Sequence, residues 1–482
     1  MQNAYLVFDI GTGNTRVALV GEDGAILDIA KENTRMYTDP IASRAQYFKP
    51  HEWQDAVFSL IRKLLVAHPD VTVRAVTGST LRQGIVLVGH DGESIVGYTN
   101  ADRRGEGFMQ ELDWKRIWEL TDLSPSPIFS AIKILGTSKL QPQVLEQTKF
   151  YTSISDWMGY VFTGRAVWER AQAMQSALYD AVRGCWSQEL CDLIGVDIGK
   201  LPELADAGTV LGPIRPEICQ ALGLAGEPVF VVGTADTQSA ISAMQAEVGE
   251  LVTVSGTTSP TLKIVTAFCK YPRTWVSPTA EPGRLMLEVN TASSGINLQR
   301  FKDTMLKDMP YEHLNEDAAQ RGLPEQNLPG MYAVFLTGMH LDQDLLTGGF
   351  VMSNPISVDT KPEDYFHALT LNIGMSISMC IEKMKTLQPL EHDYLIGCGG
   401  GFSSPVVGQT VADLTGLKVR IFDNWREATV YGGYVLCCRA TGKPVPARRQ
   451  IAEICPKPSQ ALERYYKNWK EMREHFKEFK LK

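Results

Sequence analysis

The sequence lacks the features that mark several large classes of protein. Its nine cysteines include no Cys-x-x-Cys pair and no cysteine and histidine spacing typical of a metal site; only Cys437 and Cys438 are adjacent. The longest apolar stretch, residues 369–381, contains asparagine and serine and is too short to span a bilayer. The net charge of −8 argues against a nucleic-acid backbone or an anionic membrane as the main partner. We therefore expect reduced thiols, and small ligands bound in local pockets.

Length and composition indicate a globular chain. With 482 residues, 44% of them hydrophobic and 21% charged, the chain is long enough for about two or three domains that each bury a core. The first residues enter an apolar run without a basic segment or a cleavage site, so export is not indicated. We expect a cytoplasmic protein, and the sequence leaves a monomer and a homodimer open.

A glycine-rich turn lies between two apolar runs near the start of the chain, at residues 5–8 and 17–20. This order predicts a strand, a tight turn and a second strand. Glycine lets the backbone fold closely around an anion, and the hydroxyl, amide and N–H groups of the turn can bond phosphate oxygens. Asp9 ends the first strand, where a carboxylate would repel phosphate unless Mg²⁺ lay between them. An ordinary hairpin with a glycine turn is the alternative.

A second copy of this hairpin lies near the middle of the chain. Residues 251–265 match residues 6–20 in the Leu-Val start, the Gly-Thr turn and the apolar exit. Val254 falls where Asp9 stands, so the copy lacks the carboxylate. The repeat predicts two similarly built halves, each offering a phosphate-binding turn to a cleft between them. Chance similarity of short hairpins is the alternative.

Asp236 follows an apolar strand, predicted at residues 228–232, and a Gly-Thr turn. An aspartate that opens a helix can be a simple cap. A carboxylate at the mouth of a cleft can also accept the proton of a hydroxyl that attacks a phosphoryl group. Both interpretations stay open at this point.

Further polar residues follow the strand predicted at residues 70–76, at the end where open α/β sheets bind ligands. Arg82, Gln83, Asp102 and Arg104 can make directional hydrogen bonds to a polyol, although a solvated loop with ion pairs is equally consistent with them. Asp156 stands near a predicted helix start, as a ligand or as a cap.

A triple glycine lies between a predicted strand and a helix at residues 405–415. It permits close approach of a flat ligand such as adenine or ribose. It is neither a Walker loop nor a G-x-G-x-x-G fingerprint, which disfavours P-loop and Rossmann folds. The chain closes with an amphipathic helix, predicted over residues 462–479.

These segments, in this order, resemble the FGGY carbohydrate kinases, and the resemblance covers nearly the whole chain. Residues 9–16 resemble their first phosphate motif, residues 255–258 their second, residues 233–238 the segment with the catalytic aspartate, and residues 399–429 their adenosine-binding signature. The fold class implied is α/β, with two actin-like (ribonuclease H-like) domains and a nucleotide cleft between them.

The resemblance also implies the division of labour between these domains. The N-terminal domain, residues 1–245, would bind the sugar and carry the catalytic aspartate, and the C-terminal domain, residues 246–482, would bind ATP. Asp236 would take the proton of the attacking hydroxyl, and Asp9 would hold Mg²⁺ directly or through water. The substrate implied is a small-molecule sugar, and the cofactors are ATP and Mg²⁺.

The site residues implied by the resemblance fall into two sets. The ATP contacts are Gly11, Thr12, Gly13, Asn14, Thr15, Arg16, Gly256, Thr257, Thr258, Gly399, Gly400, Gly401 and Ser404. The sugar contacts are Arg82, Gln83, Asp102, Arg104, Asp156 and Asp236.

Within the family, residues 82–87, 100–104 and 154–157 resemble segments of the bacterial autoinducer-2 kinases. Gln83 and Gln46 stand where acidic residues are usual. The chain also lacks, at residues 336–340, the Gly-Glu-Arg-x-Pro segment of many sugar kinases. A ketopentose or polyol kinase acting on xylulose, ribulose, glycerol or erythritol is therefore the alternative, because specificity depends on a few hydrogen bonds.

Two other classes compete with a kinase. A non-enzymatic actin-like scaffold or chaperone ATPase would share both phosphate turns, but it would not need Arg82, Asp102 and Asp236 around a pocket of sugar size. A metal- or serine-dependent hydrolase is disfavoured, because the eight histidines form no His-x-x-x-His and the chain has no nucleophile elbow.

Overall fold

The computed structural model describes residues 2–321, 330–335, 345 and 347–479. The chain divides into two compact units. The first contains Met1–Ala243, Ser277–Arg284 and Thr429–Ala447, and the second contains Met244–Val276, Leu285–Ala428 and Arg448–Lys482. The predicted domains are continuous in sequence, whereas two segments from the second half of the chain belong to the first unit.

A mixed sheet forms the centre of the first unit, in the strand order β14-β15-β6-β1-β2-β3. Strands β1, β2 and β3 are antiparallel, β6 runs parallel to β1, β15 parallel to β6, and β14 antiparallel to β15. The short strand β16 also pairs parallel with β6. The bounds are β1 (Gln2–Ile10), β2 (Asn14–Gly21), β3 (Ile26–Asn33), β6 (Val71–Thr80), β14 (Val210–Pro213), β15 (Val229–Val231) and β16 (Thr234–Ala235).

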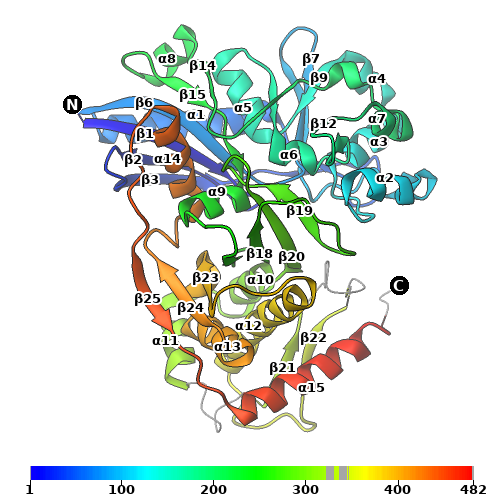
Figure 1. The fold of residues 1–482 in the computed structure, drawn as a ribbon, viewed down its shortest axis with the longest axis vertical. Coiled ribbons are helices and arrows are strands. Elements are labelled where there is room, and N and C mark those ends of the chain that lie inside the picture. The colour runs from blue at the N-terminus through cyan, green and yellow to red at the C-terminus, as the bar shows by residue number, and fades with distance from the viewer. Residues whose placement is uncertain (1, 322–329, 336–344, 346, 480–482) are drawn as a thin grey trace. The chain divides into compact units, whose positions relative to one another are not determined.

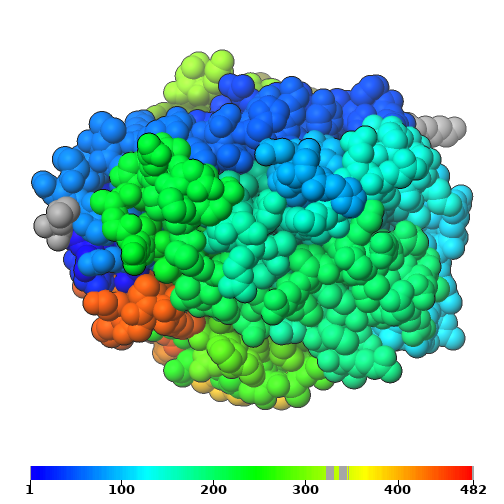
Figure 2. Space-filling model, turned by 90° about the horizontal axis from the view of Figure 1, so that it is seen from above, coloured from blue at the N-terminus to red at the C-terminus, as the bar shows by residue number. Residues whose placement is uncertain are grey.

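Helices cover both faces of this sheet (Figure 1). On one face, α1 (Pro50–Ala67) and α5 (Ile154–Thr163) share a buried cluster with the strands, in which Trp53 and Trp157 accompany Phe8. On the other face lies α14 (Ala428–Ala440), where the ring of Tyr434 is 5.8 Å from that of Tyr5. In Figure 2 the orange segment, which contains α14, lies against blue and green residues of the first unit.

Smaller elements complete the first unit. They form short sheets, 3-10 turns and helices around the main sheet. Their bounds are β4 (Tyr37–Thr38), β5 (Gln46–Tyr47), β7 (Ile85–Gly89), β8 (Ser94–Tyr98), η1 (Glu106–Glu111), α2 (Trp114–Thr121), α3 (Ser130–Leu140), α4 (Pro142–Gln147), β9 (Thr148–Thr152), β10 (Val167–Glu169), α6 (Arg170–Met174), β11 (Tyr179–Asp180), β12 (Cys185–Trp186), α7 (Gln188–Ile194), η2 (Ile198–Lys200), β13 (Glu203–Ala205), α8 (Pro216–Leu222) and α9 (Asp236–Ala243).

The second unit repeats the pattern of the first sheet. Its strand order is β19-β20-β18-β17-β23-β24-β25. Strands β17, β18 and β20 are antiparallel, β23 is parallel to β17, β24 parallel to β23, and β25 antiparallel to β24. The bounds are β17 (Leu251–Val254), β18 (Thr258–Val265), β19 (Trp275–Pro278), β20 (Leu285–Ser293), β23 (Tyr394–Cys398), β24 (Lys418–Phe422) and β25 (Gln450–Ile454). The internal repeat expected from the two hairpins is therefore present in the sheets.

Helices α12 and α13 bury one face of this second sheet, where Ile377, Val411 and Leu395 belong to one cluster. The C-terminal helix α15 packs through Trp469, which is fully buried among apolar residues of α12 and β21. The helices and remaining strands are α10 (Gly295–Met305), α11 (Tyr311–Arg321), β21 (Met331–Val334), β22 (Gly349–Met352), α12 (Pro362–Leu387), η3 (Gly400–Ser403), α13 (Pro405–Thr415) and α15 (Gln460–Phe476).

One predicted boundary was wrong in a way that matters for the site. The strand expected to end at residue 76 continues to Thr80, because β1 pairs with it as far as Ile10. Gly78 makes this possible, since a Cβ there would lie 1.9 Å from the ring of Phe8. The polar turn therefore begins only at Leu81.

Candidate functional site

The first glycine turn joins β1 to β2 at the carboxyl end of β1. The amide of Gly11 donates to the carbonyl of Asn14 at 3.0 Å, and the Thr34 hydroxyl donates to the Gly11 carbonyl at 3.0 Å. Thr12, Gly13 and Asn14 are exposed, whereas the Thr15 hydroxyl is buried against Thr34 at 3.2 Å. The exposed residues can thus contact a ligand, while Thr15 helps to hold the turn.

Asp9 is bound to two residues of the first unit. Its Oδ2 accepts from Arg16 Nε at 2.8 Å and from the Thr429 hydroxyl at 2.9 Å. Arg16 Nη2 also lies 2.7 Å from this oxygen and 2.7 Å from Thr429 Oγ1. Thr429 is the second residue of α14, a segment far away in the sequence, and sequence reasoning did not assign it to this carboxylate.

Three parallel strands end side by side in the first unit. Asp9 on β1 pairs with Ser79 on β6, and Thr234 on β16 pairs with the same Ser79. Each strand then delivers a predicted site residue: β1 carries Asp9, β6 leads to Arg82, and β16 leads to Asp236 at the start of α9. Parallel pairing therefore brings together residues from distant parts of the sequence, such as Asp9 and Asp236.

The Asp236 carboxylate accepts from the Thr237 amide at 2.7 Å and from its hydroxyl at 3.2 Å, both at Oδ1. Burial raises the pKa of this carboxyl group. The positive charge of Arg82 lowers that pKa, and the negative charge of Asp9 raises it. Arg82 and Asp9 are therefore close enough to act on the charge of Asp236, as expected for a general base in a polar site.

Arg82 and Gln83 are both buried. Gln83 has a positive φ of 60°, an uncommon conformation for a residue with a side chain. Its side-chain nitrogen Nε2 donates to the side-chain oxygen of Gln175, and its backbone carbonyl accepts from the Ser130 hydroxyl at 3.2 Å. Sequence reasoning missed Gln175, which no glycine or charge pattern marks.

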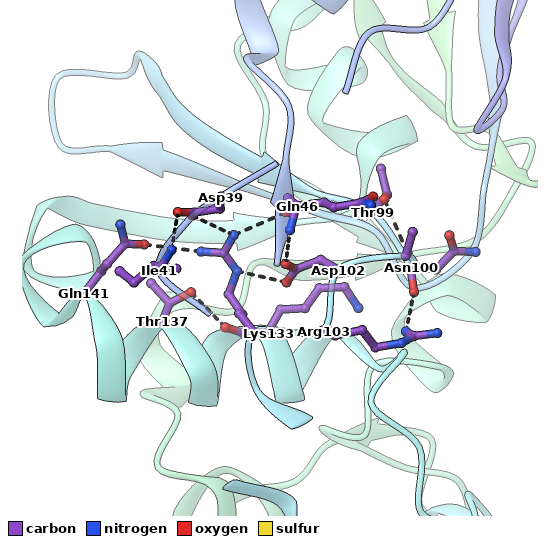
Figure 3. A network of polar contacts seen from close by, with 12 residues as sticks. Asp39, Ile41, Gln46, Thr99, Asn100, Asp102, Arg103, Lys133, Thr137 and Gln141 are labelled. Carbon is purple, nitrogen blue, oxygen red and sulfur yellow. Dashed lines mark hydrogen bonds and ion pairs between the residues drawn. The ribbon is translucent and has the colours of Figure 1, made fainter. Parts of the chain in front are cut away.

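Asp102 and Arg104 are both buried, and Asp102 belongs to a network of polar contacts with Gln46 (Figure 3). Arg104 donates from Nε to Asp102 at 2.9 Å and from Nη2 to Asp39 at 3.3 Å, and its guanidinium stacks on Tyr98 at 3.6 Å. Asp102 also accepts from the Gln46 amide at 2.8 Å. Polar partners within the protein therefore hold both residues.

Asp156 lies in the first turn of α5, where the Ser153 side chain is the cap. The Asp156 carboxylate accepts from the Ser153 hydroxyl at 2.5 Å and from the Glu169 amide at 2.8 Å. Burial raises the pKa of Asp156 to about 7. Burial, and next the charge of Asp156, raise the pKa of Glu169 to about 8.

In the second unit, two predicted segments meet. The Ser255 amide donates to the Cys398 carbonyl at 2.8 Å, and the Gly401 amide donates to the Ser255 carbonyl at 2.9 Å. A Cβ on Gly401 would lie 2.0 Å from Ser255 Oγ, so only glycine allows this approach. The Gly256 amide closes its turn on the Thr258 carbonyl at 2.8 Å.

A pocket of about 710 Å³ opens beside these turns. Five predicted ATP contacts line it: Gly256, Thr257, Gly400, Gly401 and Ser404. The Ser404 hydroxyl is buried in it and has no hydrogen-bond partner among the described residues, so it is available to a polar ligand.

Helices α10 and α11 supply most of the pocket wall that sequence reasoning missed. Their periodic charged and apolar residues carry no motif that would have marked them. The remaining lining residues are Gly295, Leu298, Gln299, Asp303, Tyr311, Glu312, Asn315, Glu316, Ala319, Ile373, Ser403, Pro405, Val407 and Arg426. Thr258 and Gly399 adjoin the pocket in sequence but do not line it. Residues 336–340 lie outside the described residues.

Metal and thiol chemistry can be checked across the described part of the chain. There, no group of three or more histidine, cysteine, aspartate or glutamate side chains is arranged to hold a metal ion. All nine cysteines are free thiols. No helix within the described ranges has the length and apolar character needed to cross a membrane.

The fold belongs to a known class. Xylulose kinase from Lactobacillus acidophilus superposes with a TM-score of 0.84 at 18% identity, covering 99% of both chains. The chain therefore has the mixed α/β, two-domain fold of the actin-like ATPase type.

Family models identify the group within this class. Residues 4–242 match the N-terminal domain and residues 319–441 the C-terminal domain of the FGGY family of carbohydrate kinases. YoaC of Bacillus subtilis (strain 168), named as a candidate sugar kinase, is 32% identical over 479 residues, or 98% of each chain. The autoinducer-2 kinase of Salmonella typhimurium (strain LT2) is 24% identical over 475 residues, covering 93% of this chain and 87% of that one. The chain belongs to the FGGY family of carbohydrate kinases and is a sugar kinase.

Proposed function

We propose that this kinase transfers the γ-phosphoryl group of ATP to a hydroxyl of a small sugar, with Asp236 as general base. The hydroxyl oxygen bonds to the γ-phosphorus while the bond to the β,γ-bridging oxygen breaks. ADP leaves, and the hydroxyl proton passes to Asp236. Two roles follow for the predicted domains: residues 1–245 bind the sugar and residues 246–482 bind ATP.

One observation carries this proposal: β1, β6 and β16 end together and deliver Asp9, Arg82 and Asp236 to one edge of a sheet. A simple cap would explain Asp236 alone, but it would not explain a basic residue and a second carboxylate acting on it. The raised pKa of Asp236 makes its carboxylate a stronger base than an exposed aspartate.

The residues also fit the nucleotide. The unpartnered Ser404 hydroxyl and the open space at Gly400 suit a polar, flat ligand in the second unit. The proposed phosphate contacts are the exposed turn residues 12–14 in the first unit and Gly256 with Thr257 in the second. Thr15 supports its turn from below.

FGGY kinases use ATP, generally with Mg²⁺. Mg²⁺ is usually held by one or two carboxylates together with substrate phosphates, rather than by an all-protein cage. The lone Asp9 carboxylate fits this pattern, and bound Mg²⁺ would neutralise phosphate charge beside it. Arg16 and Thr429 fix the orientation of that carboxylate.

The direct sugar contacts we propose are Arg82, Gln83 and Asp236. The Gln83 side chain bonds the buried Gln175, whereas Asp102, Arg104 and Asp156 each bond two or more partners within the protein. We propose that they hold the loops around the sugar rather than touch it. That assignment departs from the contacts expected by resemblance.

The proposed substrate resembles autoinducer-2, and a ketopentose or polyol is the second candidate. Local motifs around Arg82, Asp102 and Asp156 and the 24% identity to an autoinducer-2 kinase support the first. The neutral Gln83, where an acid is usual, supports keeping the second. A cytoplasmic location is part of the proposal, supported by nine free thiols.

The test is ADP release with MgATP in the presence of single compounds. The panel contains the autoinducer-2 precursor, D-xylulose, both ribuloses, erythritol, glycerol and gluconate. We expect one compound to raise turnover far above the rate without sugar. Slow hydrolysis that no compound increases would contradict the proposed substrates and favour a scaffold ATPase.

A further inference from the structure

Glu169 lies outside every predicted set, yet its side chain is central to the first unit. It ends β10, is 2% exposed, and caps the short helix α6. Its Oε1 accepts from the Ala171 amide at 2.8 Å, and its Oε2 accepts from the Gln172 amide at 3.0 Å. The carboxylate therefore fixes where α6 begins.

The same carboxylate reaches the strand that carries the general base. Oε2 accepts from the Thr234 hydroxyl at 3.2 Å, and Thr234 is completely buried in β16. Asp236 follows two residues later. A shift of Thr234 would thus be transmitted directly to the base, because β16 has only two residues.

Helix α6 reaches the sugar-binding turn through its two glutamines. Gln172 Nε2 donates to the Thr80 hydroxyl at 3.4 Å, two residues before Arg82. Gln175, which follows α6, accepts from the Gln83 side chain. Both glutamines are buried, so these contacts between α6 and the turn lie in the interior of the first unit.

We propose that Glu169 is a positioning residue that fixes the general base and the sugar-binding turn relative to each other. It acts through two sets of contacts. The first arm is the contact with Thr234, which precedes Asp236, and the second arm is the contact with α6, from which Gln175 bonds Gln83. This inference rests on the proposed function, because it assumes that Asp236 and Gln83 act on the substrate. Glu169 itself does not contact the substrate.

The chemistry of the contacts explains why two acceptor oxygens are needed. Three donors, the Ala171 and Gln172 amides and the Thr234 hydroxyl, point at the two oxygens of Glu169, and both oxygens accept. A Glu169→Gln side chain would turn an N–H group towards one of these donors. It would leave at least one buried donor unpaired, at a cost large enough to displace α6 or to prevent folding.

A matched pair of variants at position 234 therefore tests the contact between Thr234 and Glu169 without replacing Glu169. Thr234→Val keeps the shape and loses the hydroxyl, and Thr234→Ser keeps the hydroxyl. With MgATP and the panel compound of highest turnover, we expect Thr234→Val to lower kcat about tenfold or more, because small displacements of reacting groups are costly. KM for that compound should change little, and Thr234→Ser should restore most of kcat.

The second arm predicts the opposite division. Gln175→Leu should raise KM for the same compound and change kcat less, because it loosens Gln83 rather than the base. Thr148→Val is the control. Thr148 is as fully buried as Thr234, and its hydroxyl donates to the Val144 carbonyl at 2.8 Å, so it takes no part in the contacts of Glu169. It should lower the unfolding temperature and leave kcat unchanged.

A second measurement does not depend on the sugar. Hydrogen–deuterium exchange of the full chain should show faster exchange in residues 167–176 and 229–240 of Thr234→Val, and not in Thr234→Ser. The inference would be overturned if Thr234→Val showed faster exchange in only one of these two segments. It would also be overturned if kcat of Thr234→Val stayed within about twofold of wild type.

Failure of the inference and failure of the proposed function are distinguishable. If Asp236→Asn keeps full turnover, the proposed general base is wrong. If Asp236→Asn is inactive while Thr234→Val is unimpaired, the base stands and only the positioning role of Glu169 is refuted.

Discussion

The two units of this kinase contain sheets with the same strand pattern, but different residues stand at the ends of the strands. In both, an antiparallel hairpin closes with a glycine turn, and a parallel strand lies beside it. In the first unit, charged residues stand at or after the ends of these strands, and Asp9 comes before the glycine turn. In the second unit, Val254 stands at the position of Asp9, and residues 399–401 after the parallel strand are glycines. Topology alone therefore supplies a place for chemistry, and the end residues decide which chemistry it is.

The difference has a physical reason in each unit. A charged side chain at a strand end can be buried only with partners, as Arg16 and Thr429 show for Asp9. Glycines instead remove side chains, which leaves the pocket of about 710 Å³ beside Gly256 and Gly401. We infer that one unit is adapted to react and the other to hold a flat ligand.

The largest expected effect is on the first unit's base. Asp236→Asn should lower kcat by about 10²–10⁴-fold, as is typical when a general base is removed. Binding of MgADP, measured by calorimetry, should stay near wild type, because the proposed nucleotide pocket lies in the second unit. Asp113→Asn is the matched control: Asp113 caps α2 through the Arg116 amide at 3.1 Å and should affect only stability.

Closing the space in the second unit should produce the complementary effect. Gly400→Val adds a side chain where no atom lies within 4 Å of the new Cβ, so the fold should tolerate it. The side chain would project into the pocket, and KM for ATP should rise about tenfold or more, with little change for the sugar. Gly107→Val has the same free space in the first unit. An equal rise in KM for ATP in that control would contradict the assignment of the pocket.

Asp9 distinguishes the two turns most directly. Asp9→Asn keeps the size but weakens the attraction for a cation, so the Mg²⁺ concentration at half-maximal turnover should rise about severalfold. Titration of Mg²⁺ at fixed ATP measures this shift. Asp28→Asn, whose carboxylate bonds His68 and the Ile29 amide, should leave the titration unchanged. An unaltered Mg²⁺ requirement in Asp9→Asn would refute a role in metal binding.

The smallest expected effect concerns stability and pH. The pKa of Asp156 is raised in the folded state to about 7, and that of Glu169 to about 8. The folded chain therefore binds these protons more tightly than the unfolded chain, so the free energy of unfolding should fall as pH rises from about 5 to about 8. Each group contributes at most about 1.4 kcal/mol per pH unit.

Urea unfolding of wild type and Asp156→Asn across this pH range measures that contribution. The variant has one titrating group fewer, so its stability should fall less steeply with pH. Identical slopes for the two proteins would show that Asp156 does not titrate in this range.

Much of the fold was predictable because its signals are local. The helix predicted at residues 405–415 is α13, since the proline at its first position is visible in the sequence. The end of β6 was predicted wrongly. Sequence does not show that Phe8 would pack over Gly78 and keep residues 78–80 in the sheet.

The candidate site was predictable only in part. The glycine turns and Asp236 stand next to strong strand patterns and could be found. The contact of Thr429 with Asp9 and that of Gln175 with Gln83 could not be found, because they join residues 420 and 92 positions apart in the sequence. The wall formed by α10 and α11 was missed for the same reason: ordinary helical residues become pocket lining only through packing.

The family, the two related hairpins and the residue types available for phosphoryl transfer can be inferred from the amino-acid sequence alone. These depend on short segments whose backbone conformation and hydrogen-bonding capacity are set by neighbouring residues. Which polar residues are held by buried partners depends instead on how the chain folds. Arg104 and Asp102 are buried together, Asp156 binds Ser153 and Glu169, and Glu169 reaches Thr234. The reason is that a buried charge must be satisfied by whatever the fold places beside it, and parallel strands place distant segments side by side.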